Sequence, residues 1–572
     1  MTATATSTAA RTGRESGEGK AQRTLRVGVF LNSMRVEAWE HELLRRVQEL
    51  EGAEICAVVL NEGGPKYRSK LHKAWSMRSR LGWFAHNALD RRLFRKGRDA
   101  FAKVDAEPLL RGLATLSVRP RETRYCDHFE AEDVERIRSL DLDVVIRLGF
   151  RILKGDGLKV ARHGVWSFHH GDNRENRGGP PGYWEVVEGW PQTGSVLQVL
   201  SEDLDGGLVL DRSWSMTLPL SLWGNRNNCY WKSLAMLPRK LNELYRDGPE
   251  AFYARAAQQQ EPLEAYSQRL FRAPSNARAT WNALRQAGKI ARFAWNKLTR
   301  NRQWFVLWRK SDALDLSMRS FRELVPPPDR FWADPFALER DGSHWIFVEE
   351  KPFAAPKAHI SVIELDAEGN ASPARPVLDL PYHLSYPAVF EAEGQTWMLP
   401  ETGANRTIEL YRCERFPDRW QLARVLMRDV DAVDATLHHD GTRWWLFASL
   451  REYAESQHHD ELHLWSADSL EAEHWTPHPL NPVVSDVRRA RPAGALFEQG
   501  GKLYRPSQNC SHHYGYGFQV NEVLKLTPTE YEERTVTSVE PRWDPSIEGT
   551  HTLNRAGRLT VVDAYRYRSK RG

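Results

Sequence analysis

The sequence predicts a multidomain protein, with an α/β Rossmann-like domain first, a helical linker next and an all-β five-bladed propeller last. Three observations predict this class. The 572 residues exceed what a single hydrophobic core usually holds. The chain opens with a strand–helix–strand pattern, which is typical of a parallel sheet. The C-terminal half repeats one strand–turn–strand motif five times.

The α/β domain is predicted at residues 24–240, after a disordered lead at residues 1–23. Its first strand, "TLRVGVFLNS", is continuously apolar, as in a strand buried on both faces. The helix after it, "RVEAWEHELLRRVQELE", has apolar residues at helical spacing. Further strands and helices alternate in the same way, which indicates a mostly parallel sheet covered by helices. The predicted elements are residues 24–33, 35–51, 53–62, 131–150, 163–170 and 193–211.

The propeller is predicted at residues 319–572. Each repeat has a polar entry, a short strand, a turn with glycine and an apolar-aromatic strand, and two more strands follow in most repeats. Four strands per repeat in five repeats is the pattern of a five-bladed propeller. The copies are "WADPFALERDGSHWIFVEE", "SYPAVFEAEGQTWMLPE", "VDATLHHDGTRWWLFAS", "ARPAGALFEQGGKLYRPSQ" and "EGTHTLNRAGRLTVVDA".

Two basic stretches interrupt this plan. Residues 66–103 form an insertion in the first domain, with twelve Lys and Arg against Asp90 and Asp99. Residues 274–302, within a helical basic linker at 241–318, carry seven Lys and Arg and no acidic residue. Basic amphipathic helices suit an anionic membrane surface, or they pack their apolar faces on the domains and leave basic faces in solvent. Binding of a nucleic acid such as RNA is the third alternative. One helical stripe of the second stretch holds Trp281, Leu284, Ala291, Trp295 and Leu298.

Composition narrows the function classes. A net charge of +5 is too small to predict a nucleic-acid partner. Five scattered cysteines without a CxxC pair argue against a disulfide framework or a zinc site and favour the cytoplasm. The N-terminus lacks the apolar segment of a secretory signal, and no run is long enough to span a membrane. The 22 tryptophans fit either sugar-stacking surfaces or aromatic-rich sheets.

Paired histidines and a distant aspartate suggest proton transfer in the first domain. His169 and Asp205 are both expected at strand ends on one edge of the sheet, where open α/β sheets place ligands. The imidazole of His169 can accept a proton from an attacking amine, and Asp205 can hold that imidazole in the needed tautomer. The turn at residues 178–181, Gly-Gly-Pro-Pro, leaves room for a substrate.

These motifs, with "LGFRILK", "GVWSFHHGD" and "TGSVLQVLSEDLDGG", resemble the formyltransferase family. The resemblance covers about residues 24–240 and implies formyl transfer from 10-formyltetrahydrofolate to an amine. It implies His169 and Asp205 as catalytic residues. It also implies that the backbone of one loop binds the pterin of the folate. That loop consists of Gly149, Phe150, Arg151, Ile152 and Leu153.

The chain departs from the family pattern at two positions. Ser167 stands where the family has the asparagine that donates to the formyl oxygen, and a hydroxyl donates over a shorter reach. His170 replaces the usual proline and is a candidate substitute for the missing donor. The alternative is a retained fold with altered or lost chemistry, in which the two histidines belong to a cap and turn.

The predicted propeller carries acidic and basic residues at strand ends near its centre. Two carboxylates across a cleft are the groups that hydrolyse glycosidic bonds, and "ADPF" is similar to the signature of five-bladed furanosidase-type glycosidases. His551 is a further candidate, and the alternative for each acid is hydrogen bonding between blades. The candidate substrate-binding residues are Asp334, Glu401, Asp434, Arg491, Arg505 and Glu548.

The repeat region also resembles the N-terminal domain of glucosamine inositolphosphorylceramide transferases. The motifs that carry this resemblance are "FWADPF", "HLSYPAVF", "LPET", "RWWLFAS", "RPAGALF" and "LYRPSQNCSHHYG". Together the two halves predict a transferase that moves a formyl group to the amine of an amino sugar or glycan precursor, while the propeller binds or processes the glycan. The alternatives are a propeller glycosidase or glycosyltransferase with a catalytically altered formyltransferase-like module, and a non-catalytic glycan-binding protein at a membrane face.

Overall fold

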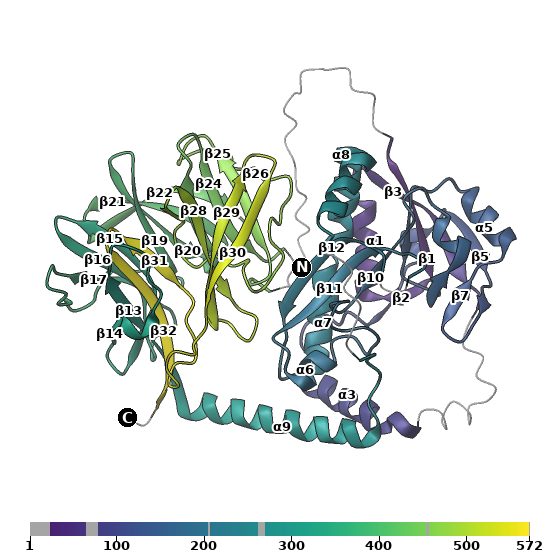
Figure 1. Ribbon diagram of the computed structural model, residues 1–572, viewed down its shortest axis with the longest axis horizontal. Coiled ribbons are helices and arrows are strands. Elements are labelled where there is room, and N and C mark those ends of the chain that lie inside the picture. The colour runs from purple at the N-terminus through teal and green to yellow at the C-terminus, as the bar shows by residue number, and fades with distance from the viewer. Residues whose placement is uncertain (1–22, 64–77, 204–205, 261–268, 453–456, 571–572) are drawn as a thin grey trace.

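The computed structural model describes residues 23–63, 78–203, 206–260, 269–452 and 457–570. Figure 1 shows an α/β domain beside a domain built of sheets, with one long helix, α9, running below both. The α/β domain comes from the N-terminal half of the chain and the all-β domain from the C-terminal half. The predicted order of α/β domain and all-β domain is confirmed.

The first domain contains a seven-stranded sheet of order β12-β11-β10-β8-β1-β3-β5. The five strands from β10 to β5 pair in parallel, and β11 and β12 add an antiparallel edge. Because the middle strands are covered on both faces, their residues are almost all buried. The strands are β1 (Leu25–Leu31), β3 (Ala53–Asn61), β5 (Ala114–Val118), β8 (Val144–Arg147), β10 (Val165–His169), β11 (Gln192–Val199) and β12 (Leu208–Met216).

Helices cover both faces of this sheet. On one face, Leu43 of α1 and Phe252 of α8 pack in the same core as Val29. On the other face, Ile137 of α5 packs with Val145. The helices are α1 (Ala38–Gln48), α3 (Leu81–Phe94), α4 (Glu107–Leu110), α5 (Ala131–Arg138), α6 (Trp184–Glu188), α7 (Leu222–Ser233), α8 (Met236–Gln258) and α9 (Asn276–Thr299).

Short elements complete the description. Two small sheets, β2-β4 and β6-β7-β9, flank the large sheet of the first domain. Their strands are β2 (Arg35–Glu37), β4 (Lys103–Asp105), β6 (Arg121–Glu122), β7 (Cys126–His128) and β9 (Ile152–Lys154). The 3-10 turns are η1 (Arg78–Arg80), η2 (Gly155–Lys159), η3 (Met318–Ser320) and η4 (Gly403–Asn405).

The second domain consists of four-stranded antiparallel sheets in sequence order. Four of them are β15-β16-β17-β18, β19-β20-β21-β22, β23-β24-β25-β26 and β27-β28-β29-β30. Their strands are β15 (Arg330–Arg340), β16 (Ser343–Pro352), β17 (His359–Leu365), β18 (Arg375–Leu378), β19 (Ser385–Ala392), β20 (Gln395–Thr402), β21 (Thr407–Arg415), β22 (Arg419–Arg428), β23 (Ala432–His439), β24 (Trp444–Leu450), β25 (Leu462–Ala467), β26 (Thr476–Pro477), β27 (Phe497–Gln499), β28 (Lys502–Asn509), β29 (Gly517–Leu526) and β30 (Tyr531–Val539).

A further sheet, β14-β13-β32-β31, joins the two ends of this domain. Its strands are β13 (Arg300–Lys310), β14 (Arg322–Leu324), β31 (Leu553–Ala556) and β32 (Leu559–Ser569). The pairing of β13 with β32 is continuous from one end of β13 to the other. Strands from opposite ends of the domain therefore share one sheet, which gives the propeller-like domain a closed arrangement.

Two predicted boundaries shift. The linker was predicted at residues 241–318, but α8 begins at Met236, and its Leu241 and Leu244 belong to the core of the first domain. The all-β domain was predicted from residue 319, but its closing strand β13 already begins at Arg300. Strand β13, "RNRQWFVLWRK", opens with four polar residues directly after a basic helix, so the sequence pattern does not mark where the strand begins.

The two domains are joined by a buried polar interface. The backbone amide of Trp214, on the edge strand β12, donates to the carbonyl of Ser485 at 3.2 Å. The buried carboxylate of Glu461 receives both terminal nitrogens of Arg239 at 2.9 Å each and the ammonium of Lys232 at 2.8 Å. Placing the domains in another arrangement would leave one of these buried charges without its partner, which is costly. The cluster therefore favours this arrangement of the two domains.

Candidate functional site

The loop predicted to bind folate lies at the carboxyl edge of the large sheet. Phe150 has a φ of 65°, which places this residue in the left-handed region. Its backbone amide donates to the side-chain oxygen of Asn32 at 2.9 Å, and the amide of Arg151 donates to Asp127 at 2.8 Å. Arg147 donates to the carbonyls of Phe150 and Arg151, at 3.3 and 3.0 Å. These backbone groups are therefore bonded within the protein.

Ser167 and His169 share a side of β10 because side chains alternate along a strand. The hydroxyl of Ser167 accepts from Arg147 twice, at 3.0 and 2.8 Å. The Nε2 atom of His169 lies 2.9 Å from the carbonyl of Asn176, whose side-chain amide donates to Glu185 at 2.8 Å. Burial raises the pKa of Glu185 to about 7.

His170 projects to the other side of the sheet. Its ring lies 3.6 Å from the ring of Tyr230 and 5.3 Å from that of Trp39, measured between centroids, and stacks on Phe168. Burial lowers the pKa of His170 well below its usual range. The structure therefore does not bring His170 to Ser167 and His169, and an oxyanion role for it has no geometric basis. Asp205 lies outside the described residues.

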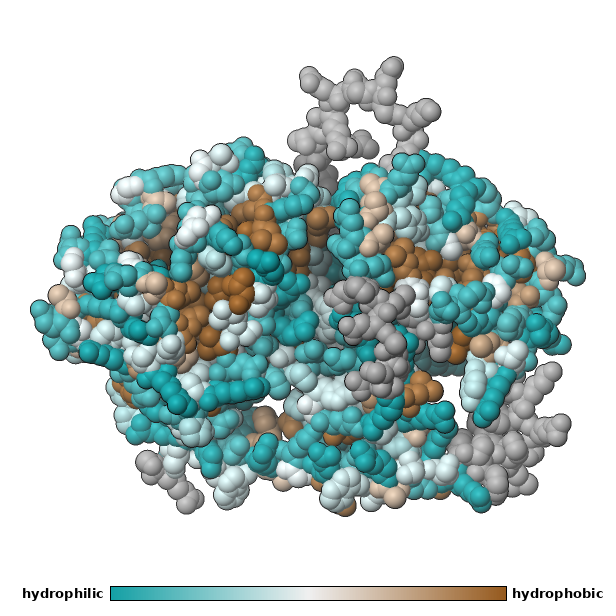
Figure 2. Space-filling view, viewed as in Figure 1, coloured by the Kyte–Doolittle hydropathy of each residue, from teal (hydrophilic) through white to brown (hydrophobic). Residues whose placement is uncertain are grey.

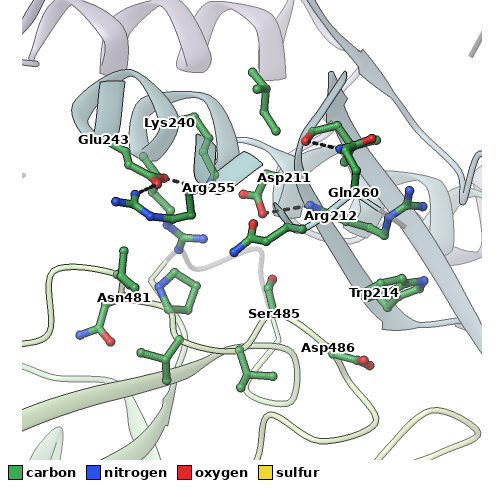
Figure 3. Close-up of a pocket in the computed structure, with 18 of the residues that line it drawn as sticks. Asp211, Arg212, Trp214, Lys240, Glu243, Arg255, Gln260, Asn481, Ser485 and Asp486 are labelled. Atoms are coloured by element: carbon green, nitrogen blue, oxygen red, sulfur yellow. Dashed lines mark hydrogen bonds and ion pairs between the residues drawn. The ribbon is translucent and has the colours of Figure 1, made fainter. Parts of the chain in front are cut away.

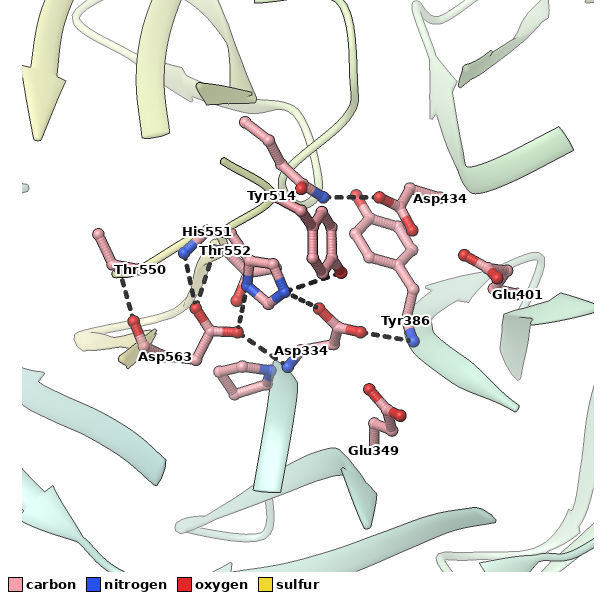
Figure 4. A network of polar contacts seen from close by, with 12 residues as sticks. Asp334, Glu349, Tyr386, Glu401, Asp434, Tyr514, Thr550, His551, Thr552 and Asp563 are labelled. Carbon is pink, nitrogen blue, oxygen red and sulfur yellow. Dashed lines mark hydrogen bonds and ion pairs between the residues drawn. The ribbon is translucent and has the colours of Figure 1, made fainter. Parts of the chain in front are cut away.

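The second domain holds a group of buried polar side chains where its innermost strands meet (Figure 4). We call it the central cluster. It is fixed by an unusual backbone, since Asp334, Tyr386 and Asp434 all have positive φ angles, of 50°, 45° and 53°. Each stands at a register shift in the first strand of its repeat. Positive φ at non-glycine residues costs energy and tends to occur at functional sites. The cluster consists of Asp334, Glu349, Tyr386, Glu401, Asp434, Arg491, Gln508, Tyr514, His551 and Asp563.

Asp563, on β32, organises one side of the central cluster. Its carboxylate lies 2.6 Å from Nδ1 of His551 and accepts the backbone amides of Asp334, His551 and Thr552, at 3.0, 2.9 and 3.1 Å. The other ring nitrogen of His551 lies 3.5 Å from Asp334 and 3.1 Å from the hydroxyl of Tyr514. Burial opposes a charge on His551, but Asp563 and Asp334 outweigh it and raise the pKa of this histidine.

Asp434 organises the opposite side. Its carboxylate accepts from the guanidinium of Arg491, at 2.5 and 3.2 Å, and from the side-chain amide of Gln508 at 2.6 Å. Arg491 also lies 4.7 Å above the ring of Tyr514 and 3.8 Å from Glu401. One arginine therefore bridges Asp434 to Glu401 across neighbouring sheets.

Three carboxyl groups of the central cluster have raised pKa values. Burial, followed by the charges of Asp434 and Asp563, raises the pKa of Asp334 to about 7, although His551 opposes this effect. Burial and neighbouring acids also raise the pKa of Glu349 and of Glu401 well above their usual range. The side chains of Glu349 and Glu401 are 11% and 15% exposed, so both reach the surface of the cluster. Buried acids of like charge hold protons near neutral pH, as acid–base catalysts do.

Two predicted residues do not join the central cluster. Arg505 stands three residues before Gln508 on β28, so its side chain projects to the opposite face of the strand. There it makes two bonds of 2.8 Å with Glu533, and both residues are buried. Glu548 is exposed and is held by its backbone amide, which donates to Tyr565. Of the six predicted propeller residues, Asp334, Glu401, Asp434 and Arg491 are brought together.

The sequence interpretation missed several members of the central cluster. Glu349, Glu401 and Asp563 lie in the second strand of their repeats, each shortly after a run of apolar residues, in "FVEE", "MLPE" and "TVVD". This shared position could have identified Glu349 and Asp563 once Glu401 was chosen. Tyr386 occupies the repeat position of Asp334 and Asp434, and its hydroxyl contacts Thr436 at 2.8 Å. It was missed because only charged residues were considered.

Two groups of side chains in the described residues have a spacing that a metal ion could use. One ligand atom from each of Asp334, His551 and Asp563 lies within 4.8 Å of the others. The second group, Glu452, Glu461 and His463, lies at the domain interface, where Arg239 already pairs with both glutamates. Charge balance in the second group comes from Arg239, whereas in the first group His551 lies between Asp334 and Asp563, and the charge of Arg491 also opposes the burial that raises the pKa of Asp334.

A cleft of about 1060 Å³ lies between the domains, lined by β12 and α8 on one side and by the loop after β26 on the other (Figure 3). Several of its charged side chains are paired within the protein. Arg212 bonds to Asp172 at 2.8 Å, and Lys240 bonds to Glu243 at 2.7 Å. The lining of the cleft carries an excess of basic residues, eight Lys and Arg against four Asp and Glu.

Comparison with known proteins supports one of the two resemblances. Residues 320–565 match the family model of the N-terminal region of glucosamine inositolphosphorylceramide transferase 1. The protein of that name from Oryza sativa subsp. japonica is 36% identical over 210 residues, which is 36% of this chain and 28% of the relative. The Arabidopsis thaliana protein is 32% identical over 210 residues, 36% of this chain and 27% of the relative. The chain therefore covers less than a third of the length of these relatives.

Solved structures align with each half at low similarity. The family 117 glycoside hydrolase Zg3597 of Zobellia galactanivorans aligns with 46% of this chain and 90% of its own, at 9% identity and a TM-score of 0.31. The α-L-arabinofuranosidase PaAbf62A of Podospora anserina aligns with 41% of this chain and 90% of its own, at 14% identity and a TM-score of 0.32. Phosphoribosylglycinamide formyltransferase of Anaplasma phagocytophilum aligns with 38% of this chain and 88% of its own, at 16% identity and a TM-score of 0.25. TM-scores at this level give the alignments no weight for activity, and the formyltransferase resemblance stays a prediction.

Proposed function

We propose that the central cluster binds a glycan and performs acid–base chemistry at a glycosidic bond, as a glycosidase or glycosyltransferase. The observation that carries this proposal is the convergence of Asp334, Glu349 and Glu401 with raised pKa values beside His551. The matching relatives support a sugar substrate, because their name couples glucosamine to inositolphosphorylceramide. An amino sugar, free or lipid-linked, is therefore the substrate class we propose.

The carboxyl groups divide the chemistry between them. Glu401, whose pKa is raised well above its usual range, carries a proton that it can donate to the oxygen of the leaving group. Asp334, with a pKa of about 7, exchanges its proton near neutral pH and can accept one from an attacking hydroxyl or water. Arg491 and Asp434 act as positioning residues, since they hold each other and orient Glu401.

The test combines a glycan array with hydrolysis of aryl glycosides of glucosamine. We expect binding of amino-sugar glycans by the wild-type protein and a fall in turnover of about 10²–10⁴-fold in Asp334→Asn and in Glu401→Gln. The control is Glu548→Gln, an exposed carboxylate outside the cluster, which should keep wild-type values. Absence of glycan binding, or full turnover by both cluster variants, would contradict the proposal.

Formyl transfer from 10-formyltetrahydrofolate is the second candidate. It is favoured by one observation, the placement of His169 and the Gly149–Leu153 loop at the same edge of the sheet. The residues present do not fit a folate well. The amides of Phe150 and Arg151 are bonded to Asn32 and Asp127, and the hydroxyl of Ser167 is bonded to Arg147. These residues therefore favour a formyltransferase-like module whose chemistry is altered.

Calorimetry with a folate analogue separates the two candidates. We expect no binding at millimolar analogue. Micromolar binding that is lost in His169→Asn would instead establish the folate site and make formyl transfer the function of the first domain. A matched control is His163→Asn, because His163 lies before β10 and outside the proposed edge.

A further inference from the structure

Helices α3 and α9 bury polar side chains against each other and against the domain. His86 on α3 contacts the side chain of Gln286 on α9 at 2.6 Å, and Gln286 donates to Asp90 at 2.6 Å. Farther along α9, Asn282 donates to the hydroxyl of Tyr183 at 3.0 Å. All of these side chains are buried. The inner sides of both helices therefore carry buried hydrogen bonds, beside apolar contacts made by Trp83 and Ala279.

The apolar side chains of α9 lie on its solvent side instead. Trp281 is 57% exposed, Trp295 63% and Leu298 73%. With Leu284 they stand three, eleven and three residues apart, which places them on one stripe of an α-helix. The stripe predicted from the sequence is present, but it faces solvent and is not packed on the domains. A helix that exposes its apolar stripe and buries its polar one indicates an apolar partner outside the protein.

Helix α3 repeats this inversion. Leu81, Leu89 and Leu93 are each more than half exposed, while His86 and Asp90 are buried. Figure 2 shows apolar side chains among hydrophilic ones along the lower edge of the molecule, where α9 lies in Figure 1. We call this surface the α3–α9 face. It consists of Leu81, Leu89, Leu93, Trp281, Leu284, Trp295 and Leu298.

The charge around the α3–α9 face is mostly basic, although Asp99 pairs with Arg91 and Glu188 lies 3.8 Å from Arg278. Residues 78–98 and residues 274–302 each contain seven Lys and Arg. The two ranges together contain one acidic residue, Asp90, which is buried and receives hydrogen bonds from Gln286, Ser221 and the Trp223 amide. The solvent side of both helices therefore combines Trp and Leu side chains with basic groups and no exposed carboxylate.

We propose that the α3–α9 face docks on the surface of an anionic lipid bilayer. Indole rings and leucines enter the boundary between headgroups and acyl chains, and each nearby Lys or Arg is attracted to anionic lipid. Helix α9 has 24 residues and is about 36 Å long, enough to lie along a membrane with its stripe inserted. Among the described residues, no helix is long and apolar enough to cross a membrane.

The charge pattern favours a bilayer over a second copy of this chain. Two copies that met through this face would bring together two sets of basic groups that outnumber the carboxylates beside them. Anionic headgroups balance those charges directly. The inference does not depend on the function of the central cluster, because it rests on helices outside the propeller-like domain.

The test is co-sedimentation of the full chain with vesicles of phosphatidylcholine alone or mixed with phosphatidylserine. We expect binding to the mixed vesicles, weak binding to phosphatidylcholine, and release by added salt. The double variant Trp295→Ser/Leu298→Ser should bind mixed vesicles at least about tenfold more weakly, since it removes the most exposed apolar groups. Both residues are more exposed than buried, so the fold should be kept, which circular dichroism checks.

The matched control is Leu422→Ser/Val536→Ser. These side chains are 45% and 44% exposed, on strands β22 and β30 of the propeller-like domain. This variant should bind vesicles as the wild type does. The proposal is overturned by absence of binding to the mixed vesicles or by equal binding of both variants. It is also overturned if sedimentation shows a dimer that Trp295→Ser/Leu298→Ser dissociates, because a second copy then covers the face.

Discussion

The edge of the large sheet and the central cluster each gather residues that the sequence marks as candidates, but they use them differently. At the sheet edge, one arginine, Arg147, bonds to Ser167 and to the carbonyls of Phe150 and Arg151, so the polar groups satisfy one another. In the central cluster, burial, together with the charges of neighbouring acids, raises the pKa values of Asp334, Glu349 and Glu401. Polar groups in contact are a candidate site when some of them can still exchange a proton or bind a ligand. Groups whose hydrogen bonds are all made within the protein are not.

The largest expected effect comes from Asp563→Ala, which removes a carboxylate from the middle of the central cluster. The change leaves the His551 charge buried without its nearest partner and frees the backbone amides of Asp334 and Thr552. Breaking a buried ion pair from one side costs about 3–5 kcal/mol. Urea unfolding followed by circular dichroism measures this loss. The exposed Glu548→Ala should change stability by less than about 0.5 kcal/mol, and a similar small loss in Asp563→Ala would show that the cluster is not held as described.

The next effect tests Glu185, an acid of α6 near the sheet edge whose pKa is raised by burial, as in the central cluster. Burial raises the pKa of Glu185 from 4.5 to about 7. Between these values the unfolded chain loses its proton first, so this residue makes stability fall as pH rises from about 4.5 to about 7. Glu185→Gln keeps an acceptor for Asn176 and should remove this fall, worth about 3 kcal/mol above pH 7.

Urea unfolding of both proteins at about pH 5, 6, 7 and 8, which covers the expected fall in stability, measures the difference between their free energies of unfolding. The two proteins should be closest at the lowest pH and diverge as pH rises. If the difference between them is constant with pH, then Glu185 is ionised in the folded protein. The sheet edge then lacks the raised carboxyl pKa that it is expected to share with the central cluster.

The smallest effect concerns the contact that distinguishes the sheet edge. Ser167→Ala removes an acceptor that Arg147 bonds twice, while the carbonyls of Phe150 and Arg151 still accept from that arginine. The loss should be about 1–2 kcal/mol. Ser469→Ala, at an exposed position, is the control and should leave stability unchanged. A gain of folate-analogue binding in Ser167→Ala would show that the arginine blocks a site that is otherwise intact.

Local patterns predicted most of the fold. The buried strand at residues 24–33 and the helix after it identify the parallel sheet, and the repeat spacing identifies the all-β domain. The boundary at Arg300 was missed because β13 pairs with a strand more than 240 residues away, and no local pattern reports such a partner. The roles of His169 and His170 could have been separated, since adjacent residues of a strand face opposite sides.

The candidate site was predicted in part for similar reasons. Asp334 and Asp434 occupy the same position in two repeats, so the sequence marks both. The engagement of Ser167 by Arg147 depends on two neighbouring strands, β10 and β8, and cannot be read from either alone. The pKa values of the central acids likewise follow from burial and from the distances between them, which only the assembled domain provides.

The pairing of β13 with β32 sets the timing of folding during synthesis. Strand β13 leaves the ribosome long before its partner β32, which lies more than 240 residues later. At ordinary translation speeds this wait lasts roughly 10–50 seconds, during which one side of β13 stays an open strand edge. The basic helix α9 directly before that strand emerges at the same stage. Nascent chains therefore pass through a period in which a chaperone, or a membrane already holding α9, can protect that edge.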